Sequence, residues 1–215
     1  MTAYDYYSIV HAALATISIS LLSILLGVPL GLGLALIRWS RVPVLNEIAI
    51  VYVSILRTCP SVTLALLLFF ALPEIGISLE PVPAGILTLA LGTSAFDAEI
   101  WRSALTNFPR DQYDAALSLG MRRFTRFRRV MLPQIVRSSL PALVNEMTLL
   151  IKASPAVAVL GIVEITRAAI RIGARTYQPL PPFIFALVIY SLIVFAFVRA
   201  QRAVERRYAL AGAPA

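Results

Sequence analysis

Long apolar runs separated by short polar segments dominate the pattern of this chain. Five of these runs approach or exceed the roughly 20 residues that an α-helix needs to cross the hydrocarbon core of a bilayer. The predicted spans extend from about Ser8 to Ile37, Leu45 to Leu72, Val82 to Leu105, Leu140 to Ile165 and Pro182 to Val198. The pattern therefore predicts an all-α membrane protein with about five transmembrane helices.

The composition supports this fold class. Hydrophobic residues make up 59% and charged residues 14% of the 215 residues, whereas soluble domains contain about 45–50% apolar and about 25% charged residues. A soluble helical protein is therefore disfavoured. Because neither an internal repeat nor a separate soluble segment is visible, residues 1–215 are interpreted as a single transmembrane domain.

Glycines and prolines predict where the spans pack closely or become irregular. Gly27 and Gly31 lie in the first span at the spacing of a close helix–helix contact. Pro155 interrupts the fourth span and leaves a backbone carbonyl without its helical partner. Arg57 and Pro60 predict a second irregular position in the second span. Irregular backbone at membrane depth is tolerated where it lines a cavity, so both positions are candidates for one.

Basic residues are concentrated on one side of the predicted membrane. The net charge is +8, and 14 of the 19 Lys and Arg residues fall on the side containing residues 38–41, 102–137 and 199–207. Cytoplasmic loops of membrane proteins are enriched in Lys and Arg, so this side is predicted to be cytoplasmic. The N-terminus is then outside and the C-terminus inside. The same rule explains the positive charge without a nucleic-acid partner.

The segment at about 109–133, between the third and fourth predicted spans, is the most charged part of the chain. Its apolar positions repeat at helical spacing on both sides of Gly120, a residue typical of helix stops. Two short amphipathic helices are therefore predicted at the cytoplasmic face, with Pro133 closing the unit. Its arginines and phenylalanines favour contact with anionic lipid. The small residues Ala115 and Ala116 favour close approach of a cytoplasmic protein, and the residues alone leave both interpretations open.

The fourth predicted span carries polar and charged side chains. Asn145, Thr148 and Lys152 are spaced i, i+3, i+7 and share one helix face, while Glu146 lies about 100° around the helix. Ionised groups at a helix centre cost roughly 2.5–3.5 kcal/mol on insertion scales, so they usually face a cavity or a partner. Either this polar face lines a substrate path and binds the two charged ends of a zwitterion, or Glu146 pairs structurally with another helix, for example through Arg57.

The order of residues around Gly120 resembles the EAA loop of bacterial ABC-importer permeases. In that loop a glycine follows the last alanine by four residues and a hydrophobic-Leu-Pro sequence ends the motif. The matching residues are Asp114, Ala115, Ala116, Gly120, Leu132 and Pro133. The resemblance also includes "LRTCP", "AEIWRSAL", "LPQIVRSSLPALVNEMTLLIK" and "VLGIVEITRAA", and it is closest to the polar amino acid uptake permeases. Asp114 departs from the usual Glu, which retains the charge but shortens its reach.

This resemblance implies that the loop at about 109–133 forms coupling helices that dock on a cytoplasmic ATPase. The implied partners are two ATPase subunits, an extracytoplasmic solute-binding protein and a second permease copy, identical or related, in the bacterial inner membrane with its lipid. The chain lacks a G-x-x-x-x-G-K-[ST] phosphate loop, so a separate subunit is expected to hydrolyse ATP and this chain is expected to be no enzyme. With one His and one Cys, no metal or cofactor is expected.

The resemblance also bears on the substrate site. Family members with a membrane amino acid site use the Glu and Lys that correspond to Glu146 and Lys152; Asn145, Thr148 and Arg57 complete the candidate site. The family commonly has Lys-Asp-Thr-Ser where this chain has "KASPA", so the acidic residue after Lys152 is missing. The expected cargo is a polar amino acid or a close derivative. The alternatives are an opine, an ectoine-like or a sulfur-containing compound, or a non-ABC membrane scaffold or channel component.

Overall fold

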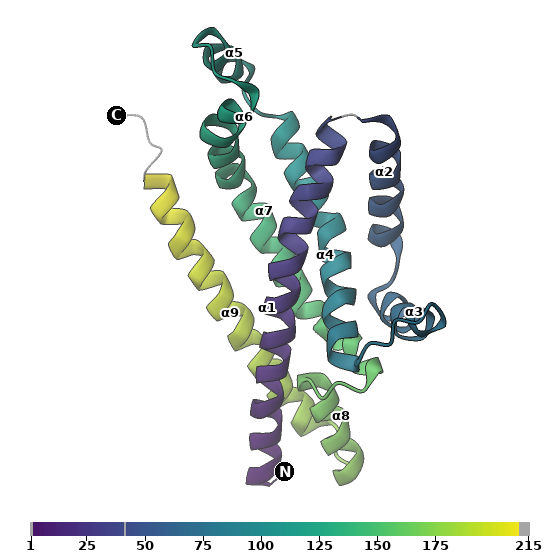
Figure 1. Ribbon diagram of the computed structural model, residues 1–215. Helices are drawn as coiled ribbons and strands as arrows, with labels where there is room; N and C mark the ends of the chain where they lie inside the picture. Colours follow the sequence, from purple (N-terminus) through teal and green to yellow (C-terminus); the bar gives the residue numbers. More distant parts are fainter. Residues whose placement is uncertain (1, 41, 211–215) are drawn as a thin grey trace.

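The computed structural model describes residues 2–40 and 42–210, and within them every regular element is helical (Figure 1). The long helices are α1 (Ala3–Ser40), α4 (Pro81–Thr106), α7 (Leu132–Ala153) and α9 (Leu180–Leu210). The shorter ones are α2 (Pro43–Thr58), α3 (Ser61–Glu74), α5 (Arg110–Ser118), α6 (Arg123–Arg126) and α8 (Ile165–Thr176). A π-helical turn, η1 (Phe127–Met131), precedes α7, and a 3₁₀ segment, η2 (Ser154–Leu160), follows it. The predicted all-α class is confirmed.

Helix α4 lies at the centre of the bundle, where it packs against α1, α2, α3 and α7. Its contact with α1 is close because two glycines of α1 face it. A Cβ atom at Gly27 would lie 3.0 Å from the carbonyl oxygen of Ala90, and one at Gly31 would lie 2.7 Å from the Cβ of Asp97. The close helix contact predicted from the Gly27/Gly31 spacing is confirmed.

Three helical segments of the described residues are long and apolar enough to cross a membrane. They are α1, the continuous segment Arg123–Leu160, and Leu180–Ala200 of α9; α2 and α3 add a fourth if they are counted as one span. Helix α4, about 39 Å long at 1.5 Å per residue, is long enough but less apolar. Its polar residues, such as Thr88 and Ser94, are buried against neighbouring helices rather than exposed. The count of five spans remains a prediction.

The second predicted span is not one continuous helix. Helix α2 ends at Thr58, α3 begins at Ser61, and the two are bent by 115°. Pro60 lies between them in an extended conformation and has no backbone N–H, so the hydrogen-bond ladder of α2 cannot continue through it. The span predicted over Leu45 to Leu72 is therefore two helices joined by a sharp bend, and the bend lies at the irregular position that Arg57 and Pro60 predict.

Two short helices flank Gly120, as the sequence predicts, but the second is not a separate unit. Helix α6 continues through η1 into α7, so the expectation that Pro133 closes the coupling segment is wrong. Pro133 lies in the first turn of α7, where the preceding π-helical turn accommodates its missing N–H. In that turn the N–H of Leu132 donates to the carbonyl of Phe127.

A polar network attaches α8 to α1 and α9. Glu164 is buried at the N-cap of α8, where its carboxylate accepts hydrogen bonds from two backbone N–H groups of the first turn. The hydroxyl of Tyr190 in α9 donates to the same carboxylate at 2.8 Å. Arg175 of α8 forms an ion pair with the buried Asp5 of α1. These contacts fix the end of the bundle that contains the start of α1.

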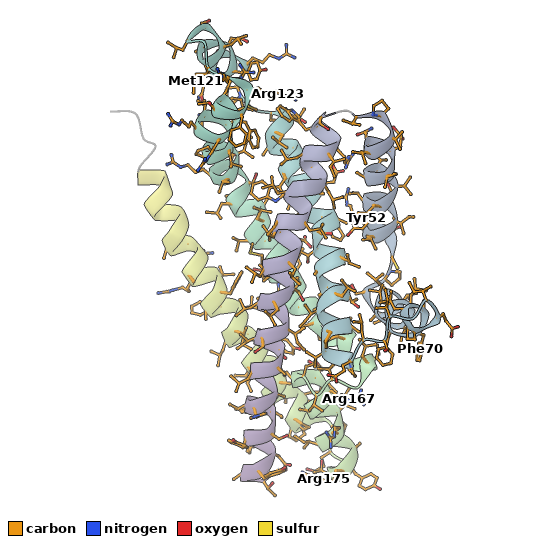
Figure 2. All side chains as sticks on the ribbon, in the orientation of Figure 1. Tyr52, Phe70, Met121, Arg123, Arg167 and Arg175 are labelled. Carbon is orange, nitrogen blue, oxygen red and sulfur yellow. The ribbon has the colours of Figure 1, made fainter. Side chains whose placement is uncertain are left out.

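The beginning and the end of the described chain lie at opposite ends of the bundle. Helix α1 begins beside α8, whereas α5, α6 and the end of α9 lie at the other end (Figure 1). Arg123 marks the end that contains α5 and α6, and Arg167 marks the end that contains α8 (Figure 2). The arginine-rich segment and the three arginines of α8 are therefore separated by the length of the bundle.

Candidate functional site

The bend between α2 and α3 borders a cavity of about 430 Å³. Its walls come from the end of α2, the start of α3, one face of α4 and one face of α7. The polar side chains among its lining residues are Arg57, Thr58, Cys59, Ser61, Thr88, Thr93 and Glu146. Leucines and Phe96 line much of the remainder. The cavity is thus apolar overall, with a few polar groups that converge on it, as in many small-molecule sites.

Arg57 and Glu146 come from different helices and line the same cavity. The guanidinium carbon of Arg57 lies 5.4 Å from the centre of the Phe96 ring, a cation–π distance. Within the described residues, neither Arg57 nor Glu146 takes part in an ion pair. A cation and a carboxylate therefore share the cavity without direct contact, and both are available to a ligand.

The start of α3 adds a partial positive charge to the same cavity. The first N–H groups of a helix have no partner within it, and the helix dipole places positive potential there. Ser61 and Leu64, both in the first turn of α3, line the cavity. Arg57 and this helix start together favour a carboxylate, while Glu146 favours a cationic group. The arrangement suits a zwitterion with an apolar portion.

The four polar residues predicted along α7 do not all line the same site. Glu146 is half-buried and lines the cavity. Thr148 is buried, and its hydroxyl donates to the carbonyl four residues earlier at 2.9 Å. Asn145 and Lys152 are exposed on the outside of α7 and are not among the cavity residues. The structure therefore brings Arg57, rather than Lys152, into the cavity with Glu146.

A polar face runs along the outside of α7. The face consists of positions three or four residues apart, and all of them are exposed or half-buried. They are Gln134, Ser138, Ala142, Asn145, the apolar Leu149, and Lys152. Near α5 this face borders a second cavity of about 700 Å³, which Ser103 of α4 and Asn107, just after α4, also line. Lipid chains cannot hydrogen-bond such groups, so this face is poorly suited to lipid contact.

Gly120 ends α5 in a Schellman motif. Its φ of +69° lies in the left-handed region that favours glycine. The N–H of Gly120 donates to the carbonyl of Leu117 at 2.9 Å, and the N–H of Met121 donates to that of Ala116 at 3.2 Å. These are the two bonds that define the motif, and they fix the direction in which the chain leaves the helix.

The predicted coupling residues occupy three environments. Asp114, Ala115 and Gly120 are exposed, whereas Ala116 is buried. Leu132 and Pro133 lie in the first turn of α7. Asp114, Ala115 and Gly120 therefore contribute exposed surface at the end of the bundle that contains α5, Ala116 packs against the rest of the protein, and Pro133 is exposed on α7.

Several residues of these two regions escape prediction from the sequence. Thr88, Gly92 and Phe96 line the cavity, and their spacing of four residues, which places them on one face of α4, is the signal that could have found them. Leu119 and Phe124 are 81% and 72% exposed at the tip formed by α5 and α6. The position of Leu119 next to the helix-stop glycine is the corresponding signal there.

Known proteins share this sequence pattern. The family described as "Binding-protein-dependent transport system inner membrane component" matches residues 27–210. The chain belongs to this family. The L-cystine transport system permease protein TcyB of Bacillus subtilis is 34% identical to this permease over 193 residues, which are 89% of this chain and 82% of TcyB. The nopaline transport system permease protein NocM of Agrobacterium fabrum is 33% identical over 205 residues, 91% and 85% of the two chains.

Solved structures share the fold of this permease. A chain of an amino acid ABC transporter crystallised with histidines is 32% identical and superimposes with a TM-score of 0.85, covering 93% of this chain and 94% of that one. A methionine ABC transporter in an inward-facing conformation has the same fold, with a TM-score of 0.79 at 20% identity over 96% and 99% of the two chains. The interpretation of the chain as an ABC-importer permease is confirmed, which leaves a non-ABC scaffold without support.

Proposed function

We propose that this permease carries a polar amino acid or a close derivative across the bacterial inner membrane and binds it in the cavity beside the α2–α3 bend. The observation that carries the proposal is the presence of Arg57 and Glu146 in one cavity without an ion pair between them. The substrate carboxylate binds Arg57 and the start of α3, and its ammonium group binds Glu146. The leucines of the cavity contact the apolar part of the substrate.

The translocation path is proposed to lie between two permease copies, identical or related. The polar face of α7 supports this arrangement because it is exposed in a single chain although it lies on a segment apolar enough to span a membrane. A facing copy would enclose this surface together with water. Asn145 and Lys152 would then line the path rather than hold the substrate.

Coupling to ATP is proposed to use the tip formed by α5 and α6. Asp114, Ala115 and Gly120 are exposed there, together with the apolar side chains of Leu119 and Phe124. Two separate ATPase subunits dock on these tips in the cytoplasm and hydrolyse ATP, and no cofactor is bound by the permease itself. A solute-binding protein delivers the substrate at the opposite end, near α8.

The proposed orientation has five crossings, formed by α1, the bent pair α2 and α3, α4, the segment containing α7, and α9. Fourteen of the 19 basic residues then lie at the cytoplasmic side, as membrane proteins prefer. The location of the start of α1 and the end of α9 at opposite ends of the bundle agrees with an odd number of crossings (Figure 1).

An opine or a sulfur-containing compound is the second candidate cargo. Relatives at 33% and 34% identity are named for the transport of nopaline, an opine, and of L-cystine, which contains sulfur. These compounds also carry both carboxylate and amino groups, so Arg57 and Glu146 fit them equally. An ectoine-like zwitterion is compatible with the same two charges. Identification of the ligand of the cognate binding protein by mass spectrometry distinguishes among the cargoes.

Uptake of that ligand by reconstituted vesicles tests the site. Glu146→Gln and Arg57→Gln should each lower uptake by roughly 10- to 100-fold, because a hydrogen bond to a charged group contributes about 1.5–3 kcal/mol. The complex with the ATPase should still assemble. Lys152→Met, which removes a charge from the outer face of α7, should change substrate affinity less. Failure of assembly in both cavity variants would instead identify a structural role for Arg57 and Glu146.

The native cysteine provides a direct test of occupancy. Cys59 is the only cysteine of the chain and lines the cavity, so no engineered thiol is needed. A maleimide should label Cys59 more slowly when substrate is present, and Glu146→Gln should remove this protection. Identical labelling rates with and without substrate in the unmodified permease would place the substrate elsewhere.

A further inference from the structure

A groove of about 620 Å³ lies where the end of α1 meets α5, α6 and η1. It shares no residue with the cavity beside the α2–α3 bend, and Phe124 is the one lining residue that also belongs to the proposed docking tip. Arg123 marks its position at the end of the bundle that contains α5 and α6 (Figure 2). The groove combines a hydrophobic floor with a cationic edge, and each part has a separate structural origin.

The floor of the groove is aromatic and aliphatic. The rings of Trp39 from α1 and Phe127 from η1 lie 6.2 Å apart, and Leu36 and Met131 also line the groove. All four belong to one hydrophobic cluster that connects the end of α1 with η1. The floor is therefore part of the folded core, and its shape does not depend on a mobile side chain.

The edge of the groove carries two arginines. Arg123 is exposed and, within the described residues, its guanidinium forms no hydrogen bond or ion pair. Arg126 is only 6% exposed; its guanidinium donates to the Tyr113 hydroxyl at 2.8 Å and lies 4.1 Å from the centre of that ring. A guanidinium has five N–H donors, so the bond to Tyr113 orients Arg126 without exhausting it. No carboxylate is among the described residues that line the groove.

We propose that this groove binds one anionic phospholipid, with the phosphate at Arg123 and Arg126 and the upper acyl chain against Trp39 and Phe127. The inference rests on the proposed orientation, which puts the groove at the cytoplasmic surface, where anionic lipids are attracted to basic residues. Tryptophan is enriched at that depth of the membrane. Basic pockets between transmembrane helices on this side are known to bind phospholipid headgroups.

Charge and polarity favour a lipid over a protein segment as the occupant. A protein segment would have to present an acidic group and a large apolar group together to match Arg123 and the Trp39–Phe127 floor. A phospholipid has both in one molecule and is present at this depth in every membrane. The most exposed apolar side chain of the neighbouring tip, Leu119, is not part of the groove and remains available for the ATPase.

Trp39 can report occupancy of the groove directly. The chain has two tryptophans, Trp39 and Trp101. Trp101 is buried, and its indole N–H has no partner among the described residues. Trp101→Phe should therefore leave Trp39 as the only tryptophan that emits, without loss of a hydrogen bond. The full-length variant is placed in nanodiscs containing brominated phosphatidylglycerol or brominated phosphatidylcholine. Phosphatidylglycerol should quench Trp39 at lower mole fraction, by about fivefold for each arginine engaged.

Arg123→Gln should remove about fivefold of this preference, and Arg123→Lys should retain most of it. Arg128→Gln is the matched control, because Arg128 is exposed nearby on η1 but does not line the groove. An equal effect of Arg128→Gln would show a diffuse field of arginines rather than a site. Loss of the preference on addition of inorganic phosphate, but not of chloride at matched ionic strength, would replace the lipid with free phosphate.

Association with the ATPase, measured in parallel by copurification, separates this inference from the proposed function. Arg123→Gln should lose about fivefold of the lipid preference and keep the ATPase. If the variant instead loses the ATPase and keeps the preference, the groove belongs to the ATPase interface and the lipid site is wrong. Absence of ATPase binding in the unmodified permease would contradict the proposed coupling role while leaving the lipid measurement interpretable.

Discussion

Two exposed regions of this permease have surfaces that do not match their expected surroundings. The outer face of α7 is polar, with Asn145 and Lys152 exposed, although α7 belongs to a segment apolar enough to cross a membrane. The tip formed by α5 and α6 has the opposite mismatch, because Leu119 and Phe124 are exposed in the most highly charged part of the chain. Each surface is therefore complete only when something else covers it.

The difference between the two regions indicates what covers each. A polar face at membrane depth requires water or another protein, since lipid leaves hydrogen-bonding groups unsatisfied. In the proposed orientation the tip lies in the cytoplasm, where an exposed apolar patch indicates a contact with another protein or with the membrane surface. Helix α9 shows the ordinary case, because its exposed side chains, such as Leu187 and Leu192, match a lipid environment. Exposed side chains of the single chain thus indicate a different neighbour on each of the three surfaces.

The largest expected effect comes from filling the α7 face. Ala142→Trp places a large side chain on this face, where a second copy and the path are proposed to lie. Uptake should fall to the level of vesicles without permease, while the ATPase still copurifies. Leu187→Trp on the exposed side of α9 is the matched control and should leave uptake nearly unchanged. Equal losses of uptake in both variants would remove the distinction between the two surfaces.

A lysine placed on the outer face of α7 should cost less free energy of membrane insertion than one placed on the exposed face of α9. Leu187→Lys exposes an ammonium group to lipid, which costs roughly 2.5–3.5 kcal/mol near the centre of a span. Ala142→Lys adds the same charge to a face that already carries Lys152 and should insert with a smaller cost. The fraction of chain inserted in a glycosylation-reporter assay measures both values. A larger penalty at position 142 would mean that the α7 face contacts lipid.

Removal of the apolar tip should affect the other mismatched region alone. Leu119→Asp replaces the most exposed large apolar side chain of the α5–α6 tip with a charge. Central interface residues contribute about 2 kcal/mol or more, so the affinity for the ATPase should fall roughly 30-fold. Gln112→Asp, also exposed on α5 but in its first turn, should have a smaller effect. Thermal stability should be unchanged, and unaltered ATPase affinity would exclude this tip as the docking surface.

The long helices and their close contacts are predictable because their causes are local. Apolar runs specify the spans, and the Gly27/Gly31 spacing specifies the approach of α1 to α4. The bend at Pro60 is foreseen as an irregularity, but its angle of 115° is not, since that depends on how α3 packs against α4 and η2. Pro133 does not end the segment as its sequence suggests, because a π-helical turn accommodates its missing N–H, and no simple sequence rule predicts such a turn.

The composition of the cavity depends on tertiary structure, and the sequence predicts it less well. Asn145, Thr148 and Lys152 share an idealised helix face, yet Thr148 is buried and the other two point outward, because the neighbouring helices decide which part of that face is covered. The charge of Arg57 is the sequence feature that makes it a candidate partner for Glu146. Only the fold shows that the two line one cavity without an ion pair.

The smallest expected effect comes from changing the direction of the chain at Gly120 while the apolar side chains of the α5–α6 tip are kept. A Cβ at Gly120 would meet no atom within 4 Å, so only its φ of +69° constrains the residue. Gly120→Ala should therefore destabilise the Schellman turn by about 1 kcal/mol and weaken ATPase binding by about fivefold, with Leu119 still present but misdirected. Gly120→Asn should lose less, because asparagine tolerates the left-handed conformation. Titration of the ATPase against both variants measures the difference. Equal losses of ATPase affinity in both variants would show that the ATPase contacts the glycine itself and does not depend on the direction of the chain.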